Sequence, residues 1–211
     1  MLTVACVLKA GGIYDATWVA RLRNGVAKHL PTAHQFVCLS DVDVPCEHIP
    51  LKHDWPGWFA KLELFKLYGP VLFFDLDTLI VGDISELAAF AEESPFAMLQ
   101  DFYRGWGLGS GVMAWNGCDQ SYALFYDTFK GDPKNWMTAC PDGDQQFIER
   151  VGYAHAIDRL QYALPGQIVS YKVHCQNGIP PDTRVICLHG KPKFQDMPVN
   201  DSVRLAWEAY A

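Results

Sequence analysis

The sequence predicts an α/β fold: one domain with a Rossmann-like, mostly parallel central sheet flanked by helices. Short apolar runs alternate with amphipathic segments along the 211 residues, which is the pattern of a three-layer α/β domain. Half of the residues are hydrophobic and 19% are charged, as in folded globular proteins. Because no repeat, low-complexity tract or linker interrupts the chain, we expect a single domain over residues 1–211.

Hydrophobic periodicity gives the individual elements. Residues 2–9 form an apolar run typical of a strand, and a turn at Ala10-Gly11-Gly12 follows it. Val19, Leu22 and Val26 recur at helical spacing and predict a helix over about 17–29. The later predicted elements are strands over 35–39 and 47–51, a helix over 58–67, a strand over 71–76, a helix from about 85, strands over 96–99 and 112–115, helices over 122–129 and 144–151, strands over 168–172 and 184–188, and a helix from about 202.

Charge and cysteine content exclude several classes of function. The net charge is −7, so there is no basic footprint for nucleic acid or for an anionic membrane surface. The first residues, MLTVACVLKAGG, lack a signal-peptide pattern, and no apolar run is long enough for a membrane span. The seven cysteines include no CxxC pair, and several lie in apolar runs as small buried hydrophobes. We therefore expect a cytoplasmic protein with reduced thiols.

Two carboxylates end the most apolar strand, in the stretch VLFFDLDTLIVGDI at 71–84. Burying an unpartnered charge is expensive, so Asp75 and Asp77 need compensation. Side chains at i and i+2 point to one side of an extended chain, and their α-carbons are about 6.5 to 7 Å apart. Such a pair can hold Mg²⁺ or Mn²⁺, which favour oxygen ligands and share them with substrate phosphates. The alternative is a hydrated strand end in which both aspartates cap a turn.

A second alternative is a phosphatase of the haloacid-dehalogenase type, whose strand-end DxD holds a nucleophilic aspartate and Mg²⁺. That family has Thr or Val two places after the second aspartate. Here Leu79 stands at that place and Thr78 is one position early. The motif also usually opens the chain, whereas a predicted βαβ unit precedes it here. The phosphatase stays open as an alternative.

The stretch VLFFDLDTLIVGDISEL resembles the glycogenin-like glycosyltransferases of family 8 and their bacterial relatives, which have the GT-A fold. The resemblance implies a metal on the DxD that neutralises the diphosphate of a sugar donor. The segment CVLKAGGIYDATWVARL resembles the first strand and loop of that family. It implies that Leu8, Gly11 and Tyr14 contact the nucleotide.

The segments before and after the DxD resemble the family as well. PGWFAKLELFKL matches the helix that carries a basic residue toward the phosphates, which implies this role for Lys61, with Lys66 as a competitor. GWGLGSGVMAWN resembles the sugar-pocket segment and implies contacts from Ser110 and Gly111. It departs from the family at Gly109, where an asparagine is usual.

Further positions follow from the resemblance. Asp101, at the end of a predicted strand, is a candidate contact to the donor hexose. DGDQQFI matches the Asp-Gln pair that opens a helix in family members. The match implies that Asp144 contacts the transferred sugar and that Gln145 lies near its anomeric carbon. The simpler explanation for Asp144 is a helix N-cap.

ICLHGKPKF resembles the C-terminal His-Gly and Lys-Pro element of the family in a compressed form. The resemblance implies that His189 is the third metal ligand and that Gly190 and Lys191 contact the diphosphate. It extends over about residues 2–194.

Together these motifs predict a metal-dependent GT-A glycosyltransferase that takes a hexose from a nucleotide diphosphate sugar, with UDP-hexose as the expected donor. Mn²⁺ or Mg²⁺ is the expected cofactor, bound to Asp75, Asp77 and His189. Resemblance to family 8 implies retention of anomeric configuration. The residues identify neither the acceptor nor the oligomeric state. A non-catalytic sugar-nucleotide-binding module is the alternative from another class.

Overall fold

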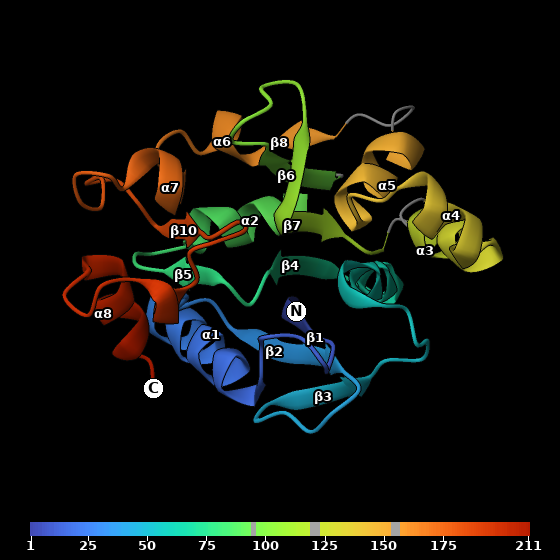
Figure 1. Ribbon diagram of the computed structural model, residues 1–211, viewed down its shortest axis with the longest axis horizontal. Helices are drawn as coiled ribbons and strands as arrows, with labels where there is room; N and C mark the ends of the chain where they lie inside the picture. The colour runs from blue at the N-terminus through green and yellow to red at the C-terminus, as the bar shows by residue number, and fades with distance from the viewer. Residues whose placement is uncertain (94–95, 119–122, 153–156) are drawn as a thin grey trace.

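A seven-stranded sheet forms the centre of the computed structural model, which describes residues 1–93, 96–118, 123–152 and 157–211 (Figure 1). Its strands, in the order β3-β2-β1-β4-β7-β6-β8, are β3 (Glu47–Pro50), β2 (His34–Ser40), β1 (Leu2–Leu8), β4 (Pro70–Phe74), β7 (Leu108–Asn116), β6 (Phe96–Gln100) and β8 (Asp158–Arg159). Among the strands that the structure describes in this sheet, only β7 runs antiparallel to its neighbours. The prediction of a mostly parallel sheet is therefore confirmed.

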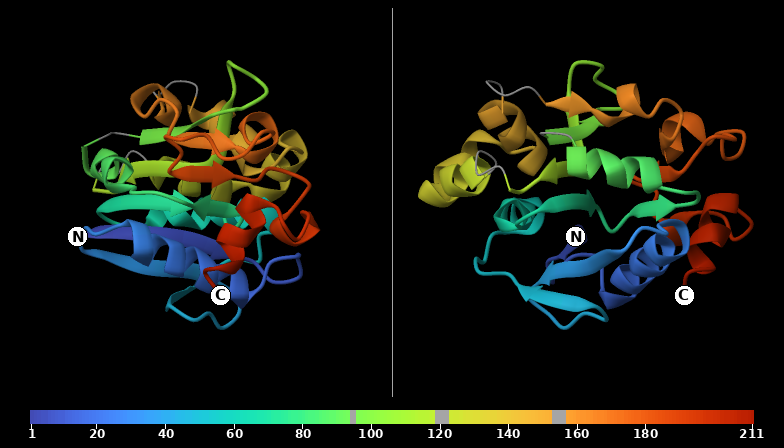
Figure 2. Two further views of the ribbon diagram at one scale, coloured as in Figure 1. Left: turned by 90° about the vertical axis from the view of Figure 1, so that its left-hand side faces the viewer. Right: turned by 180° about the vertical axis from the view of Figure 1, so that it is seen from behind.

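Helices cover both faces of the sheet. They are α1 (Ala16–His29), the 3-10 helix η1 (Gly57–Lys66), α2 (Ser85–Glu93), α3 (Ala123–Gly131), α4 (Pro133–Ala139), α5 (Asp144–Val151), α6 (Leu160–Ala163), α7 (Tyr171–His174), the 3-10 helix η4 (Phe194–Asp196) and α8 (Ser202–Glu208). In Figures 1 and 2, α1 and α8 lie on one side of the sheet, and α3, α4 and α5 on the other. A second sheet of three strands, ordered β5-β10-β9, consists of β5 (Thr78–Ile80), β10 (Val185–Cys187) and β9 (Ile168–Ser170).

The side chains of β1 show how the strand separates two hydrophobic cores. Leu2, Val4, Cys6 and Leu8 pack into the core that α1, α2 and α8 cover. Ala5, between them, faces the other core, which η1, α3 and α5 cover. This alternation follows from the two-residue period of a strand. Burial on both faces explains why the strand reads as an apolar run.

The main departure from the predicted elements lies at the DxD motif. We expected one extended strand over 71–76, but β4 ends at Phe74 and a turn follows, in which Thr78 N donates to Asp75 O at 3.0 Å. The chain then enters β5, which pairs with β10 in the second sheet. The partner strand lies more than 100 positions further along the chain. Local periodicity carries no information about such a partner.

Other differences involve short elements. The strand expected over 168–172 ends at Ser170, and α7 replaces its last residues. The helices α4, α6 and η4 and the strand β8 were not predicted, because each is too short for a periodic pattern. The helix predicted from Tyr122 begins at Ala123 in the described part of the chain, and Tyr122 itself lies outside the described residues.

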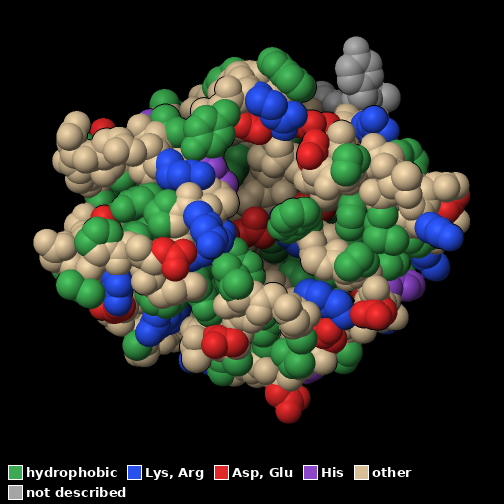
Figure 3. Space-filling model, in the orientation of Figure 1, with side chains coloured by type: hydrophobic (Ala, Val, Ile, Leu, Met, Phe, Trp, Pro, Cys, Tyr) green, Lys and Arg blue, Asp and Glu red, His purple; other side chains and the backbone are tan. Residues whose placement is uncertain are grey.

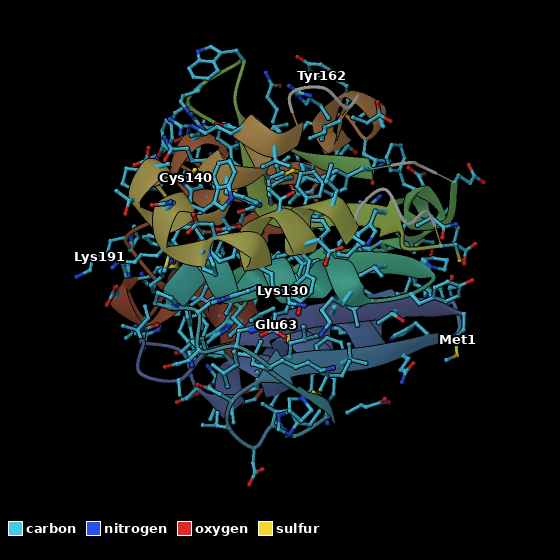
Figure 4. All side chains as sticks on the ribbon, turned by 90° about the vertical axis from the view of Figure 1, so that its right-hand side faces the viewer. Met1, Glu63, Lys130, Cys140, Tyr162 and Lys191 are labelled. Carbon is cyan, nitrogen blue, oxygen red and sulfur yellow. The ribbon has the colours of Figure 1, made fainter. Side chains whose placement is uncertain are left out.

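The amino-terminal end of β1 and the carboxyl-terminal end of β10 lie on opposite sides of the molecule. Met1, which precedes β1, and Lys191, which follows β10, lie at opposite edges in Figure 4.

No helix within the described ranges has the length and apolar character needed to cross a membrane.

A glycine after β7 allows that strand to lie beside β4. Gly117 N donates to Gly69 O at 2.6 Å, and a Cβ on Gly117 would collide with the carbonyl oxygen of Leu67. We expect Gly117→Ala to lower the free energy of unfolding by about 1 to 3 kcal/mol, as overpacking does. Gly131, at the end of α3, is the matched control because a Cβ there meets nothing within 4 Å. Urea unfolding of Gly117→Ala and Gly131→Ala measures the difference, and equal midpoints would contradict the prediction.

Candidate functional site

A pocket of about 870 Å³ opens where β1, β4, β6 and β10 end. Figure 3 shows it as a hollow near the centre of this face, with acidic side chains on its floor and basic ones beside it. The carboxyl ends of strands are the usual ligand sites of such sheets. Thirteen of the predicted site residues line this pocket: Gly11, Tyr14, Lys61, Asp75, Asp77, Asp101, Ser110, Gly111, Asp144, Gln145, His189, Gly190 and Lys191.

Leu8 is the predicted residue that does not line the pocket. Its side chain is 1% exposed and packs in the core under α1. The pocket is lined instead by its neighbours Val7 and Lys9, because side chains alternate along β1. A contact from Leu8 to a ligand would have to come from its backbone.

The two carboxylates of the DxD motif have different partners. Asp75 Oδ1 lies 3.2 Å from Lys61 Nζ. Asp77 Oδ2 accepts a hydrogen bond from Tyr14 Oη at 2.9 Å and forms an ion pair with Lys193. We expected both side chains on one side of an extended chain, but the turn at residues 75–78 directs them to separate cations. Both still line the same pocket.

Lys61 connects several elements beneath the pocket. Its Nζ lies 3.0 Å from Asp144 Oδ2 and donates to Ser110 Oγ at 3.0 Å, in addition to its contact with Asp75. Desolvation would lower the pKa of Lys61, but the charges of Asp144 and Asp75 outweigh it and raise the pKa. Lys66, the competing candidate, is exposed, and its Nζ lies 5.0 Å from the ring centroid of Tyr126. Lys61 is therefore the lysine of η1 at the DxD motif.

A glycine places Asp144 beside Lys61. Gly143 has a φ of 94°, and a Cβ on it would lie 2.8 Å from Trp58 Cε3. A side chain at this position would be strained and would also clash with Trp58. With glycine there, α5 begins at Asp144, whose side chain turns inward and is buried. The N-cap explanation for Asp144 does not apply, because Gly143 is the N-cap residue.

Asp101 holds the second residue of α5. Its Oδ2 accepts hydrogen bonds from Gln145 Nε2 at 3.2 Å and from Arg104 Nε at 2.9 Å. Desolvation would raise the pKa of Asp101, but hydrogen bonds from Tyr103 N and from Arg104 outweigh it and lower the pKa. The ionised carboxylate thus orients the amide of Gln145.

His189 lines the pocket but is bonded elsewhere. Its Nε2 lies 2.6 Å from Ser170 Oγ, and its ring stacks on Phe102 with 5.5 Å between centroids. Burial lowers the pKa of His189 and Lys172 adds to the effect, so the imidazole is neutral near pH 7.

The structure does not bring Asp75, Asp77 and His189 together as three metal ligands. Over the ranges 1–93, 96–118, 123–152 and 157–211, no three His, Cys, Asp or Glu side chains are grouped so that they could hold a metal ion. The chemistry of the site still fits Mg²⁺ or Mn²⁺, because two carboxylates face one pocket. Such ions are commonly bound by one or two carboxylates together with substrate phosphates. His189 as a third ligand stays a prediction.

Lys193 is a residue of the site that was not predicted from the sequence. Its side chain is buried against Asp77, whereas Lys191, two positions earlier, is exposed and points away from the molecule in Figure 4. The signal available in the sequence was the second lysine of Gly190-Lys191-Pro192-Lys193.

Removal of Lys61 tests the buried ion pairs. Lys61→Met leaves Asp144 without a cation, so we expect the free energy of unfolding to fall by about 3 to 5 kcal/mol. Lys66→Met, on the same helix and exposed, should change it by less than about 0.5 kcal/mol. Adding Asp144→Asn to Lys61→Met should recover part of the loss, because the buried charge is then removed. Urea unfolding measures all three, and equal stability of the two single variants would contradict the ion-pair account.

Comparison with known proteins gives similarity in structure. No family model matches the sequence, and no curated protein matches it. The chain is similar to the glycosyltransferase GlyE of Streptococcus pneumoniae TIGR4, with a TM-score of 0.68 at 14% identity over 99% of this chain and 59% of GlyE. It is also similar to the galactosyltransferase LgtC in complex with donor and acceptor sugar analogues, with a TM-score of 0.64 at 12% identity over 99% of this chain and 93% of LgtC. The chain is also similar to the bifunctional glycosyltransferase WbbM, with a TM-score of 0.61 at 12% identity over 99% of this chain and 51% of WbbM.

This chain therefore spans about 59% of the length of GlyE. The similarity extends over nearly all of the chain, at identities too low to transfer an activity. It agrees with the fold class predicted from the motifs. The chain has the GT-A glycosyltransferase fold.

Proposed function

We propose that this chain is a metal-dependent glycosyltransferase that moves a hexose from a nucleotide diphosphate sugar, with UDP-hexose as the donor we favour, to an acceptor. The observation that carries the proposal is the linked set of charges in one pocket. Lys61 contacts the first aspartate of the DxD motif and also Asp144, which opens α5. The groups proposed for the diphosphate are thus held next to those proposed for the sugar.

Different residues of the pocket are assigned to different parts of the sugar donor. We assign the nucleotide to Tyr14, Gly11 and the backbone at Leu8, where β1 ends. Gly190 and Lys191 would contact the diphosphate, and the exposure of Lys191 leaves its ammonium free to reach a ligand. Lys61 is 6% exposed and already has three polar partners. We therefore assign it to fixing the carboxylates rather than to contacting phosphate.

Asp75 and Asp77 would hold the divalent cation, Mn²⁺ or Mg²⁺. When bound, the cation would neutralise charge on the diphosphate and on the departing nucleotide. His189 is the third ligand we propose, since it lines the same pocket and its neutral imidazole suits Mn²⁺. It would first have to leave its contact with Ser170.

Residues at the start of α5 and on β7 would act on the hexose. Asp144, Ser110 and Gly111 line the pocket beside Lys61 and are assigned to the sugar. Gln145 Nε2 is committed to Asp101, so the carbonyl oxygen Oε1 is the atom left to face a ligand. A carbonyl oxygen near the anomeric carbon would stabilise positive charge that develops there. We also propose that the transfer retains the anomeric configuration of the hexose.

The two alternatives are less well supported. The GT-A fold favours a glycosyltransferase over a haloacid-dehalogenase-type phosphatase. A non-catalytic sugar-nucleotide-binding module would use the same pocket and the same nucleotide contacts. Turnover of the donor separates that module from an enzyme.

Metal and nucleotide should stabilise the protein together. At 100 times its Kd, UDP with Mn²⁺ adds about 2.7 kcal/mol to the free energy of unfolding, which corresponds to a rise in Tm of about 5 to 10 °C. With EDTA in place of Mn²⁺ the rise should be much smaller, because the diphosphate then lacks its cation. A thermal-shift assay with UDP, GDP and ADP in both buffers tests base and metal at once. Equal shifts with Mn²⁺ and with EDTA would contradict metal dependence.

Two adjacent glutamines give a matched test of catalysis. Gln145→Ala should slow hydrolysis of the cognate UDP-hexose by about 10²-fold, while UDP binding stays unchanged. Gln146 turns to another surface and accepts a hydrogen bond from Asp142 N, so Gln146→Ala should hydrolyse the donor normally. Sugar release followed by NMR gives the rate and the first anomer formed. Absence of hydrolysis by the parent across a panel of nucleotide sugars would favour the binding module.

A further inference from the structure

Lys193 is built into the site rather than placed on its rim. The residue is 8% exposed, and its Nζ forms an ion pair with Asp77 Oδ2 and lies 5.5 Å from the ring centroid of Tyr14. Its backbone is also fixed, because Lys193 N donates to Asp196 Oδ2 at 3.0 Å and Asp196 N donates to Lys193 O at 2.9 Å.

The next residue anchors the segment in the core. Phe194 is fully buried, and its ring stacks on Trp207 of α8 with 5.0 Å between centroids. The ammonium of Lys193 is therefore presented to Asp77 by a segment with little freedom to move. The ammonium can reach another partner only by rotation of the Lys193 side chain.

The contacts of Asp77 create a competition. Its Oδ2 already receives the Tyr14 hydroxyl and the Lys193 ammonium. A divalent cation that binds Asp77 through Oδ2 would displace that ammonium, which would then be left in a buried position without an anion. Such a charge is expensive. The diphosphate of a nucleotide is an anion that could accept it, since phosphate oxygens pair readily with lysine.

We propose that Lys193 couples metal binding to nucleotide binding: its ammonium pairs with Asp77 in the free protein and passes to the diphosphate when metal and nucleotide bind together. This inference rests on the function proposed above. It assigns to Lys193 a diphosphate contact that the family motifs implied for Lys61, Gly190 and Lys191 but not for Lys193. It also predicts that metal alone binds weakly and that UDP tightens it.

The coupling between Mn²⁺ binding and UDP binding has an expected size, given as a factor in affinity. Coupling between two sites typically changes affinity by about 5- to 150-fold, and the factor is the same in both directions. We expect UDP to increase Mn²⁺ affinity by a factor in this range, and Mn²⁺ to increase UDP affinity equally. Electron paramagnetic resonance of free Mn²⁺ gives the first affinity, and calorimetry with UDP gives the second.

Lys193→Met is the direct test. It frees Asp77 and removes a phosphate contact, so Mn²⁺ alone should bind more tightly than to the parent by about fivefold or more. UDP in the presence of Mn²⁺ should bind more weakly, and the coupling factor should fall. These opposite signs would not arise from general damage to the fold. Lys193→Gln removes the charge but keeps a hydrogen-bond donor beside Asp77, so it should shift both affinities in the same directions by smaller factors, and it serves if the Met variant does not fold.

Lys191→Met is the matched control from the same segment. Because Lys191 is exposed and makes no ion pair among the contacts of the described residues, its loss should weaken UDP binding and leave the affinity for Mn²⁺ alone unchanged. If Lys193→Met and Lys193→Gln bind Mn²⁺ and UDP with the parent's coupling factor, the role of Lys193 is overturned while the proposed function stands. If the parent binds neither Mn²⁺ nor UDP, both proposals are overturned.

Discussion

The buried ammonium of Lys61 is the contact on which the site depends. It lies within 3.2 Å of carboxylate oxygens from the DxD turn and from the start of α5, and it donates to Ser110 on β7. Four separate elements therefore meet at one charge. A cation in such a place is stable only while its anions stay close. The same requirement keeps η1, the turn, β7 and α5 in fixed positions around the pocket.

Charge in the pocket is balanced locally, and the net charge of the protein gives no guide to it. The chain carries −7 overall, yet lysines at positions 9, 61, 191 and 193 line the pocket. Three of them are paired with aspartates, at the DxD motif, at Asp144 and at Asp41 and Asp54. A diphosphate would enter a site in which three of these four lysines already have partners. Binding would therefore involve exchange of partners as well as attraction.

The sheet supplies the rigidity that this exchange requires. Strands β1 and β4 are buried on both faces, between the core under α1, α2 and α8 and the core under η1, α3 and α5. The loops that follow them are held at one edge of the sheet by these two cores. The small sheet adds a second support, because β10 pairs with β5 directly after the DxD turn. The segment with His189 and Lys193 thereby returns to the DxD motif.

The sequence by itself determined what depends on neighbouring residues. Apolar runs and helical spacing gave the α/β class and the mostly parallel sheet, and α5 begins at Asp144 as predicted. Thirteen of the residues that the motifs identified line one pocket, and most of them follow the end of a strand or open a helix, whereas Lys61 lies within η1 and Ser110 and Gly111 lie within β7. These features are encoded over a few residues, where periodicity and turn chemistry act.

Only the tertiary structure decided which side chains meet. Lys193 pairs with Asp77 across 116 positions of the chain, and His189 meets Ser170 rather than the two aspartates. The strand expected over 71–76 ends at Phe74 and a turn follows it, because the chain then enters β5, which pairs with β10. Leu8 faces the core because the pleat of β1 turns it away from the pocket. Such contacts depend on how distant segments pack, and local sequence patterns do not contain that information.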